Sequence, residues 1–252
     1  MFIPYIGITD FRTVDQVWAM LKVMDDNLGD KARRLMVGVM MSYRTLHGLP
    51  TRWTDAFPRN EEIAEIFTDH PRSYNALHFA DYKSDVQIED LRRAIDLCGQ
   101  HLHAIQFDMI WPDVELLRTL KREYPTVDLI LQIGTGALAK VDSDPVLVLQ
   151  KLLSYGPGII DVVLLDQSMG KGKRLQADLL MPFVQALFPH FHVAIGGGLG
   201  PTTMDLVGPF VRQFPGISWD AQGQLRPSGS ALDPIDWSMA EEYIVRSIEM
   251  IF

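Results

Sequence analysis

The segment HVAIGGGLGPTTMDLVGPF (192–210) contains the structural unit that repeats along the chain. A short apolar run at 192–196 predicts a β-strand, and the glycines after it predict a tight turn. Pro201 fits the first turn of a helix, which we expect over 201–212. A strand, a turn and a helix in direct succession are typical of parallel α/β folds.

The same unit recurs from one end of the chain to the other. We expect strands at 2–8, 34–41, 76–80, 102–108, 127–133, 159–166, 192–196 and 216–220. We expect helices at 13–27, 60–69, 87–99, 112–124, 143–154, 175–187, 201–212 and 234–250. Eight such pairs in 252 residues predict one (β/α)8 TIM-barrel domain spanning 1–252. The alternative, an open doubly wound sheet, rarely needs eight regular repeats.

The composition and net charge limit which classes of protein and which kinds of partner are expected. Hydrophobic residues make up 47% and charged residues 22%, as in ordinary globular proteins. The net charge of −9 argues against nonspecific nucleic-acid binding but leaves a small anionic ligand possible. The single cysteine, Cys98, cannot form an intrachain disulfide, which favours the cytoplasm. We find no signal peptide and no apolar run long enough to cross a membrane, so no membrane partner is expected.

The barrel prediction directs attention to the carboxyl ends of the strands, where barrel active sites lie. Gly196, Gly197 and Gly198 follow the seventh predicted strand and precede the helix that begins with Pro201. Glycines let the backbone approach a ligand closely, and a helix N-terminus attracts anions. These three glycines therefore predict a phosphate site, and a tight turn without a ligand is the alternative reading.

The end of the sixth predicted strand carries two further candidates. Asp166 closes the apolar run, and burial there would raise its pKa and suit it to general acid catalysis. The alternative is a loop or capping aspartate. A loop with two glycines and two lysines follows and could close over a phosphorylated ligand, although a solvated turn would look similar. Its candidate residues are Gly170, Lys171, Gly172 and Lys173.

Other strand ends supply weaker candidates. Arg44 and Arg52 lie in a long loop and could clamp a carboxylate or phosphate, or could simply be surface residues. The remaining acidic and glycine candidates are Asp10, Asp108, Asp220 and Gly223. We interpret His78 as a core histidine, because it alternates with Leu77 and Phe79. No ligand spacing indicates a metal, and no cofactor is expected.

Five segments together resemble the phosphoribosylanthranilate isomerases, which are tryptophan-pathway barrels. YIGITD (5–10) is similar to their opening Lys-Ile-Cys-Gly-Ile-Thr, and AIQFD (104–108) to their Val-Gln-Leu-His strand. DVVLLDQSMGKGKRLQADLL (161–180) resembles their sixth strand and glycine-rich loop. VAIGGGLGPTTM (193–204) resembles their phosphate turn, and PGISWDAQGQLRPSGSALDPIDW (215–237) their last strand and following loop.

The resemblance implies a role for several positions. Asp166 matches the family's general acid, and the loops after the seventh and eighth strands match its phosphate site. An arginine after the second strand would hold the anthranilate carboxylate. Ile6 stands where the family has its catalytic cysteine, and Asp108 stands where it has a histidine. Isoleucine cannot accept a proton, and a general acid–base step typically contributes about 10²–10⁴-fold in rate.

These features lead to two hypotheses. The first is an isomerase-like enzyme acting on a phosphorylated sugar or related small phosphate, with Asp166 as the acid and Asp10 or Asp108 as its partner. The second is a non-catalytic barrel that binds a phosphorylated metabolite. A different barrel reaction is a third reading, although no strand carries a Schiff-base lysine and the histidines needed for a metal-dependent epimerase are lacking. We expect a monomer or a homodimer.

Overall fold

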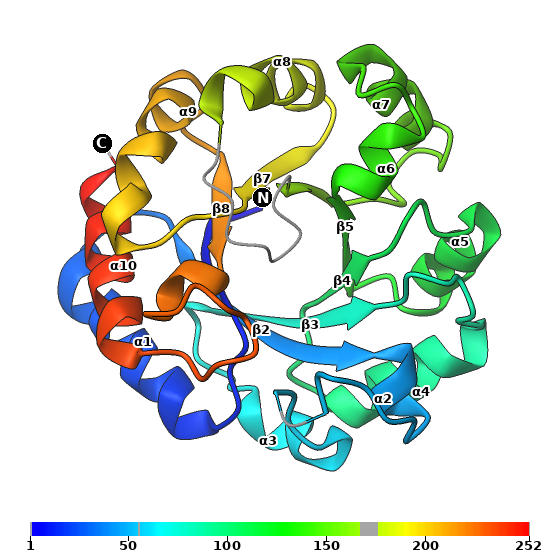
Figure 1. Ribbon diagram of the computed structural model, residues 1–252, viewed down its shortest axis with the longest axis horizontal. Helices are drawn as coiled ribbons and strands as arrows, with labels where there is room; N and C mark the ends of the chain where they lie inside the picture. Colours follow the sequence, from blue (N-terminus) through cyan, green and yellow to red (C-terminus); the bar gives the residue numbers. More distant parts are fainter. Residues whose placement is uncertain (1, 55, 167–175, 252) are drawn as a thin grey trace.

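Eight parallel strands form a closed barrel at the centre of the molecule, and helices surround it (Figure 1). The structure is a computed structural model that describes residues 2–54, 56–166 and 176–251. In these ranges the strands are β1 (Tyr5–Thr9), β2 (Arg34–Ser42), β3 (Ser73–Ala80), β4 (Ala104–Asp108), β5 (Asp128–Ile133), β6 (Val162–Asp166), β7 (His192–Gly196) and β8 (Ser218–Ala221). Each strand pairs with the next in chain order, and β8 pairs with β1. The predicted TIM barrel is confirmed.

The outer layer is helical. The α-helices are α1 (Val14–Leu28), α2 (Tyr43–Leu46), α3 (Ile63–Ile66), α4 (Ile88–Cys98), α5 (Val114–Glu123), α6 (Thr135–Ala139), α7 (Pro145–Leu153), α8 (Ala177–Leu187), α9 (Gly208–Gln213) and α10 (Trp237–Glu249). Three short 3-10 segments are η1 (Asn60–Glu62), η2 (Pro201–Val207) and η3 (Gly223–Leu225). Helices α2 and α6 and segment η3 lie in loops at the carboxyl ends of strands, and the sequence patterns did not predict them.

Local sequence explains where the longer helices begin. The hydroxyl of Thr13 accepts from the amide of Gln16, whose side chain accepts from the Thr13 amide in return. This capping box satisfies two amides that the first turn would otherwise leave without partners. Asp113 and Asp144 accept from amides at the starts of α5 and α7 in the same way. The four buried positions of α4 repeat at helical spacing and pack on the barrel.

Alternate residues of each strand point in opposite directions. Ile6 and Ile8 of β1 belong to the large apolar cluster between the barrel and its helices. Tyr5 belongs to a smaller cluster inside the barrel, together with residues such as Met36 and Tyr74. Because side chains alternate along a strand, Gly7 and Thr9 also face the interior. Tyr5, Tyr74 and the smaller apolar side chains packed with them fill the amino-terminal part of the barrel interior.

The segment after β7 differs from its prediction. We expected a regular helix from 201 to 212, but η2 is a 3-10 segment and the short α9 follows it. Pro209 lacks the N–H that would bond to the Asp205 carbonyl in an α-helix, and the amide of Gly208 bonds there instead. Among the described residues, no helix is both long enough and apolar enough to cross a lipid bilayer.

Candidate functional site

A cavity of about 530 Å³ opens at the carboxyl ends of the strands. Most of the site residues expected from the sequence line it, namely Arg44, Arg52, Asp108, Asp166, Gly196, Gly197, Gly198, Asp220 and Gly223. Asp10 is not among the lining residues. Gly170, Lys171, Gly172 and Lys173 lie outside the described residues. The topology therefore brings together side chains that are far apart in the sequence.

Two carboxylates flank a glycine on three neighbouring strands. Asp166 of β6 pairs with Gly196 of β7, which pairs with Asp220 of β8. From the spacing of adjacent strands, the two aspartates are about 10 Å apart at their backbones. No side chain stands between them, because the middle position is glycine. This row leaves room for a small molecule between two groups that can exchange protons.

Asp220 is the more deeply buried of the two. Its carboxylate accepts hydrogen bonds from the Thr9 hydroxyl at 3.0 and 3.2 Å. Burial raises the pKa of Asp220 to about 7, and the nearby Asp166 also raises it. A β-carbon at Gly7 would lie 2.7 Å from Asp220 Oδ1, so the glycine on β1 makes room for this carboxylate. A carboxyl group that titrates near neutrality can act as an acid or as a base.

Asp10 lies behind the cavity wall. It follows β1 with a φ of 107°, an uncommon backbone conformation for a residue other than glycine. Its carboxylate is paired with the fully buried guanidinium of Arg226, which also donates to the carbonyls of Gln222 and Asp233. Burial raises the pKa of Asp10 to about 7, and Arg226 opposes that rise. The structure thus brings Asp220, rather than Asp10, to the space beside Asp166.

Ile6 has no direct access to the cavity. Its side chain is fully buried in the cluster between the barrel and the helices. The neighbouring residue that faces the interior is Gly7, and the Asp220 carboxylate fills the space that a side chain at this position would need. The position that resembles the family's catalytic cysteine therefore carries an apolar side chain that points away from the site.

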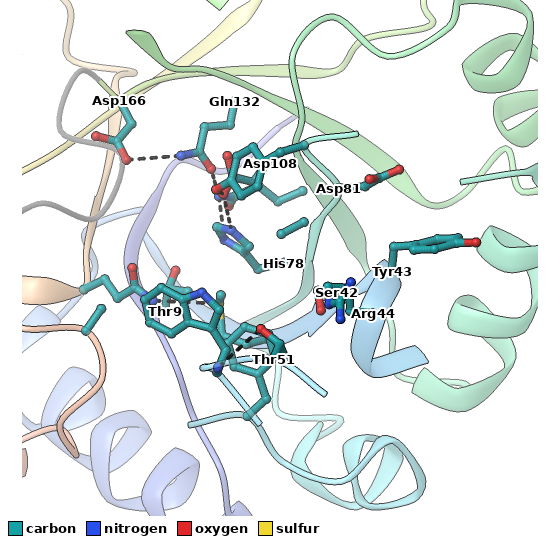
Figure 2. A pocket seen from close by; sticks show the side chains of 18 of the residues that line it. Thr9, Ser42, Tyr43, Arg44, Thr51, His78, Asp81, Asp108, Gln132 and Asp166 are labelled. Carbon is teal, nitrogen blue, oxygen red and sulfur yellow. Dashed lines mark hydrogen bonds and ion pairs between the residues drawn. The ribbon is translucent and has the colours of Figure 1, made fainter. Parts of the chain in front are cut away.

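Hydrogen bonds connect polar side chains across β3, β4, β5 and β6. Figure 2 shows His78, Asp108, Gln132 and Asp166 gathered at one side of the cavity. Gln106 Nε2 lies 2.9 Å from His78 Nδ1 and 2.9 Å from Gln132 Oε1. Gln132 Nε2 donates to Asp166 Oδ2 at 3.1 Å, and His78 Nε2 lies 3.5 Å from Asp108 Oδ2. The Tyr82 hydroxyl donates to the same oxygen of Asp108.

The opposite wall comes from the loop after β2 and is aromatic and cationic. Trp53 and Phe57 stack with their ring centroids 6.1 Å apart, and the guanidinium of Arg52 lies 4.9 Å from the Trp53 centroid. Arg44 donates two hydrogen bonds to the Pro50 carbonyl, at 2.7 and 3.1 Å. Arg44 therefore holds the loop, and Arg52 is the cation better placed to meet an anionic ligand.

At the end of β7 the cavity wall consists of glycine backbone, without side chains. Gly197 and Gly198 adopt φ values of 99° and 66°, a region that residues with a β-carbon rarely occupy. Both glycines line the cavity, as does Gly223 at the start of η3. Since η2 is a 3-10 segment, the expected regular helix N-terminus is absent at 201–207, and the glycine backbone itself would have to contact an anion.

Two further carboxylates lie near the cavity but away from its centre: Asp81 stabilises a loop, and Asp85 is exposed to solvent. Asp81 accepts from the amides of Lys83 and Val86 at 3.0 and 2.9 Å, and it points away from the central space in Figure 2. Asp85 lies exposed at the rim. In the described part of the chain, no group of three or more His, Cys, Asp or Glu side chains is arranged to hold a metal ion.

Sequence reasoning did not select several residues of the site. Thr9, His78, Gln106 and Gln132 all point into the barrel, and all are nearly inaccessible to solvent. The available signal was a polar residue at an alternate position of an otherwise apolar strand. Such a position is costly unless the polar group finds a partner, and here each of the four side chains has at least one, while Gln106 Oε1 has none among the described residues.

Comparisons with known proteins support the fold. No protein-family model and no curated protein matches the chain. Among solved structures, TrpF from Jonesia denitrificans, a phosphoribosylanthranilate isomerase, is similar at a TM-score of 0.58 and 12% identity, over 97% of this chain and 96% of that one. A Rubisco-like protein from Rhodopseudomonas palustris matches at a TM-score of 0.58 and 11% identity, over 97% of this chain and 63% of that one. The chain thus shares the barrel fold of these two proteins over nearly its whole length.

Proposed function

We propose that this chain is an acid–base enzyme of the isomerase type that acts on a phosphorylated sugar or a related small phosphate. The observation that carries the proposal is the row Asp166–Gly196–Asp220, in which two carboxylates flank an open position on one cavity wall. A pKa near 7 for Asp220 suits it to proton transfer at neutral pH. Asp166 is the acid and Asp220 is its partner.

The remaining walls fit the other parts of such a substrate. The backbone of Gly197 and Gly198 can approach a phosphate closely, as glycine turns in barrels commonly do. Arg52 and the ring of Trp53 on the opposite wall suit a second anionic or planar group. Asp108 can accept a hydrogen bond from a sugar hydroxyl. The fold likeness to TrpF supports trying phosphoribosylanthranilate first.

The test combines turnover with binding. We expect Asp166→Asn and Asp220→Asn each to lower kcat by about 10²–10⁴-fold while binding persists, because each removes a proton-transfer group. Asp85→Asn is the matched control, since Asp85 is a carboxylate at the rim outside the row. Full activity of Asp166→Asn would contradict the proposal.

A second candidate function is a non-catalytic barrel that binds a phosphorylated metabolite. The observation that favours it is Ile6, which supplies no proton acceptor and points away from the cavity. A thermal-shift screen of sugar phosphates, run beside the turnover assay, separates the two. Stabilisation without turnover would favour the binding protein, and turnover that depends on Asp166 would favour the enzyme.

A further inference from the structure

A continuous chain of polar contacts joins two carboxylates of the cavity. It runs from Asp108 through His78, Gln106 and Gln132 to Asp166. Its three middle members are buried in the barrel interior, with 6% of the His78 surface exposed and less of the two glutamines. Uncompensated burial of three polar side chains would be costly, so the contacts among them determine their orientation.

The hydrogen bond at the Asp166 end sets the direction of the others. The side-chain amide nitrogen of Gln132 donates to Asp166 Oδ2, an oxygen that can accept whether or not the other carboxyl oxygen carries a proton. The oxygen of Gln132 then faces Gln106, whose amide nitrogen donates to it and, with its second proton, to His78 Nδ1. His78 Nδ1 must therefore be the unprotonated nitrogen.

The unprotonated Nδ1 of His78 determines which group the imidazole presents to Asp108. In a neutral imidazole that accepts at Nδ1, the proton resides on Nε2, which lies 3.5 Å from Asp108 Oδ2. This separation is long for a hydrogen bond, and catalytic contacts of this kind often shorten when a ligand binds. Tyr82 donates to the same oxygen. Among the described residues, no side chain donates to Asp108 Oδ1, which remains as the acceptor for a ligand.

We propose that His78 is a positioning residue: a neutral imidazole, protonated on Nε2 under the direction of Gln106, that orients Asp108 towards the ligand. This inference rests on the proposed function for its catalytic meaning. His78 itself moves no proton in this scheme.

Nitrogen NMR of the imidazoles tests the protonation of His78 without any substrate. The spectra separate protonated from unprotonated ring nitrogens, and His78→Gln identifies the signals of His78 by their loss. We expect an unprotonated Nδ1 and a protonated Nε2 at neutral pH. His103 is an internal reference, because its Nδ1 accepts from the Asn75 amide at 3.0 Å and should show the same pattern.

A substitution at Gln106 makes the test sharper. Gln106→Glu replaces the donor with an acceptor, so the proton of His78 should move to Nδ1, or both nitrogens should become protonated. Gln106→Leu removes the donor without adding an acceptor and should give a mixture of tautomers, with His103 unchanged in both variants. A protonated Nδ1 in the wild type, or an unchanged His78 pattern in Gln106→Glu, would overturn the proposal.

Kinetics then measure the positioning itself. His78→Gln retains a side-chain donor and should keep kcat within about tenfold of wild type, whereas His78→Phe should lose more than about tenfold in kcat with little change in KM. Unchanged kcat in His78→Phe would overturn the positioning role. If the wild type turns over no substrate, the proposed function fails, and the NMR result still decides the state of His78.

Discussion

The β1–β8 side and the β3–β6 side of the cavity hold carboxylates by different physical means. Asp220 on the first side is deeply buried and accepts hydrogen bonds from the Thr9 hydroxyl and the Ala221 amide, but burial is the larger influence and raises its pKa to about 7. On the second side, Asp166 accepts from the Gln132 amide and Asp108 accepts from the Tyr82 phenol, with the His78 imidazole 3.5 Å from Asp108. One cavity thus offers a carboxyl group that titrates near neutrality beside carboxylates that are fixed in orientation by hydrogen bonds. Differences of this kind allow acid and base roles to be divided.

The largest expected effect comes from the ion pair behind the β1–β8 side. Arg226→Met leaves Asp10 buried without its partner, and such a change typically costs about 3–5 kcal/mol of stability. Urea unfolding measures the loss. The control is Arg59→Met, which removes a surface arginine from its pair with Glu62 and should change stability far less. Equal losses in the two variants would show that the Asp10–Arg226 pair does not stabilise this side.

The second effect tests the steric fit of Asp220. Gly7→Ala places a methyl group 2.7 Å from Asp220 Oδ1 and 3.0 Å from Met36 Cε, and overpacking of this kind costs up to about 3 kcal/mol. Gly216→Ala is the matched control, because its β-carbon would meet only Phe188 at an ordinary 3.5 Å. Thermal or urea unfolding compares the two. A Gly7→Ala protein as stable as Gly216→Ala would mean that Asp220 has room to move.

The Gly7 contact also shows what the sequence could and could not predict. The barrel was predictable, because eight strand and helix patterns alternate with regular spacing. The inward face of β1 was not, since both of its faces are apolar and a strand buried on both sides shows no alternation. Asp10 therefore resembled a site residue as much as Asp220 did. The structure distinguishes the two through Arg226, which pairs with Asp10 and is 216 residues away from it in the chain.

The third effect is the pH dependence of stability. The folded chain keeps the Asp220 proton up to about pH 7, whereas an unfolded aspartate releases it near pH 4. The folded state binds more protons between these values, so the free energy of unfolding falls as pH rises. Between about pH 5 and 8, the free energy of unfolding of Asp220→Asn should therefore fall by about 2 kcal/mol less than that of the wild type. The remaining slope would include Asp10, whose pKa is also raised to about 7.

Urea unfolding at several pH values measures this difference. Asp85→Asn, at the exposed rim, should keep the wild-type slope and controls for the loss of one carboxylate. A wild-type slope in Asp220→Asn would mean that Asp220 ionises normally. The β1–β8 side would then hold its carboxylate as the β3–β6 side does, and the distinction between the two sides would disappear.

The smallest effect is expected on the hydrogen-bonded side. Tyr82→Phe removes one donor from Asp108, but Tyr82 is 54% exposed and water can replace its hydroxyl, so the stability cost should stay below about 1 kcal/mol. Tyr155→Phe is the control with the same chemical change in a buried setting. It leaves the Pro112 carbonyl without its 2.7 Å partner and should cost about 1–3 kcal/mol. Urea unfolding of both variants gives the comparison. If Tyr82→Phe costs as much as Tyr155→Phe, Asp108 depends on a single donor, and His78 contributes less to holding it than its position indicates.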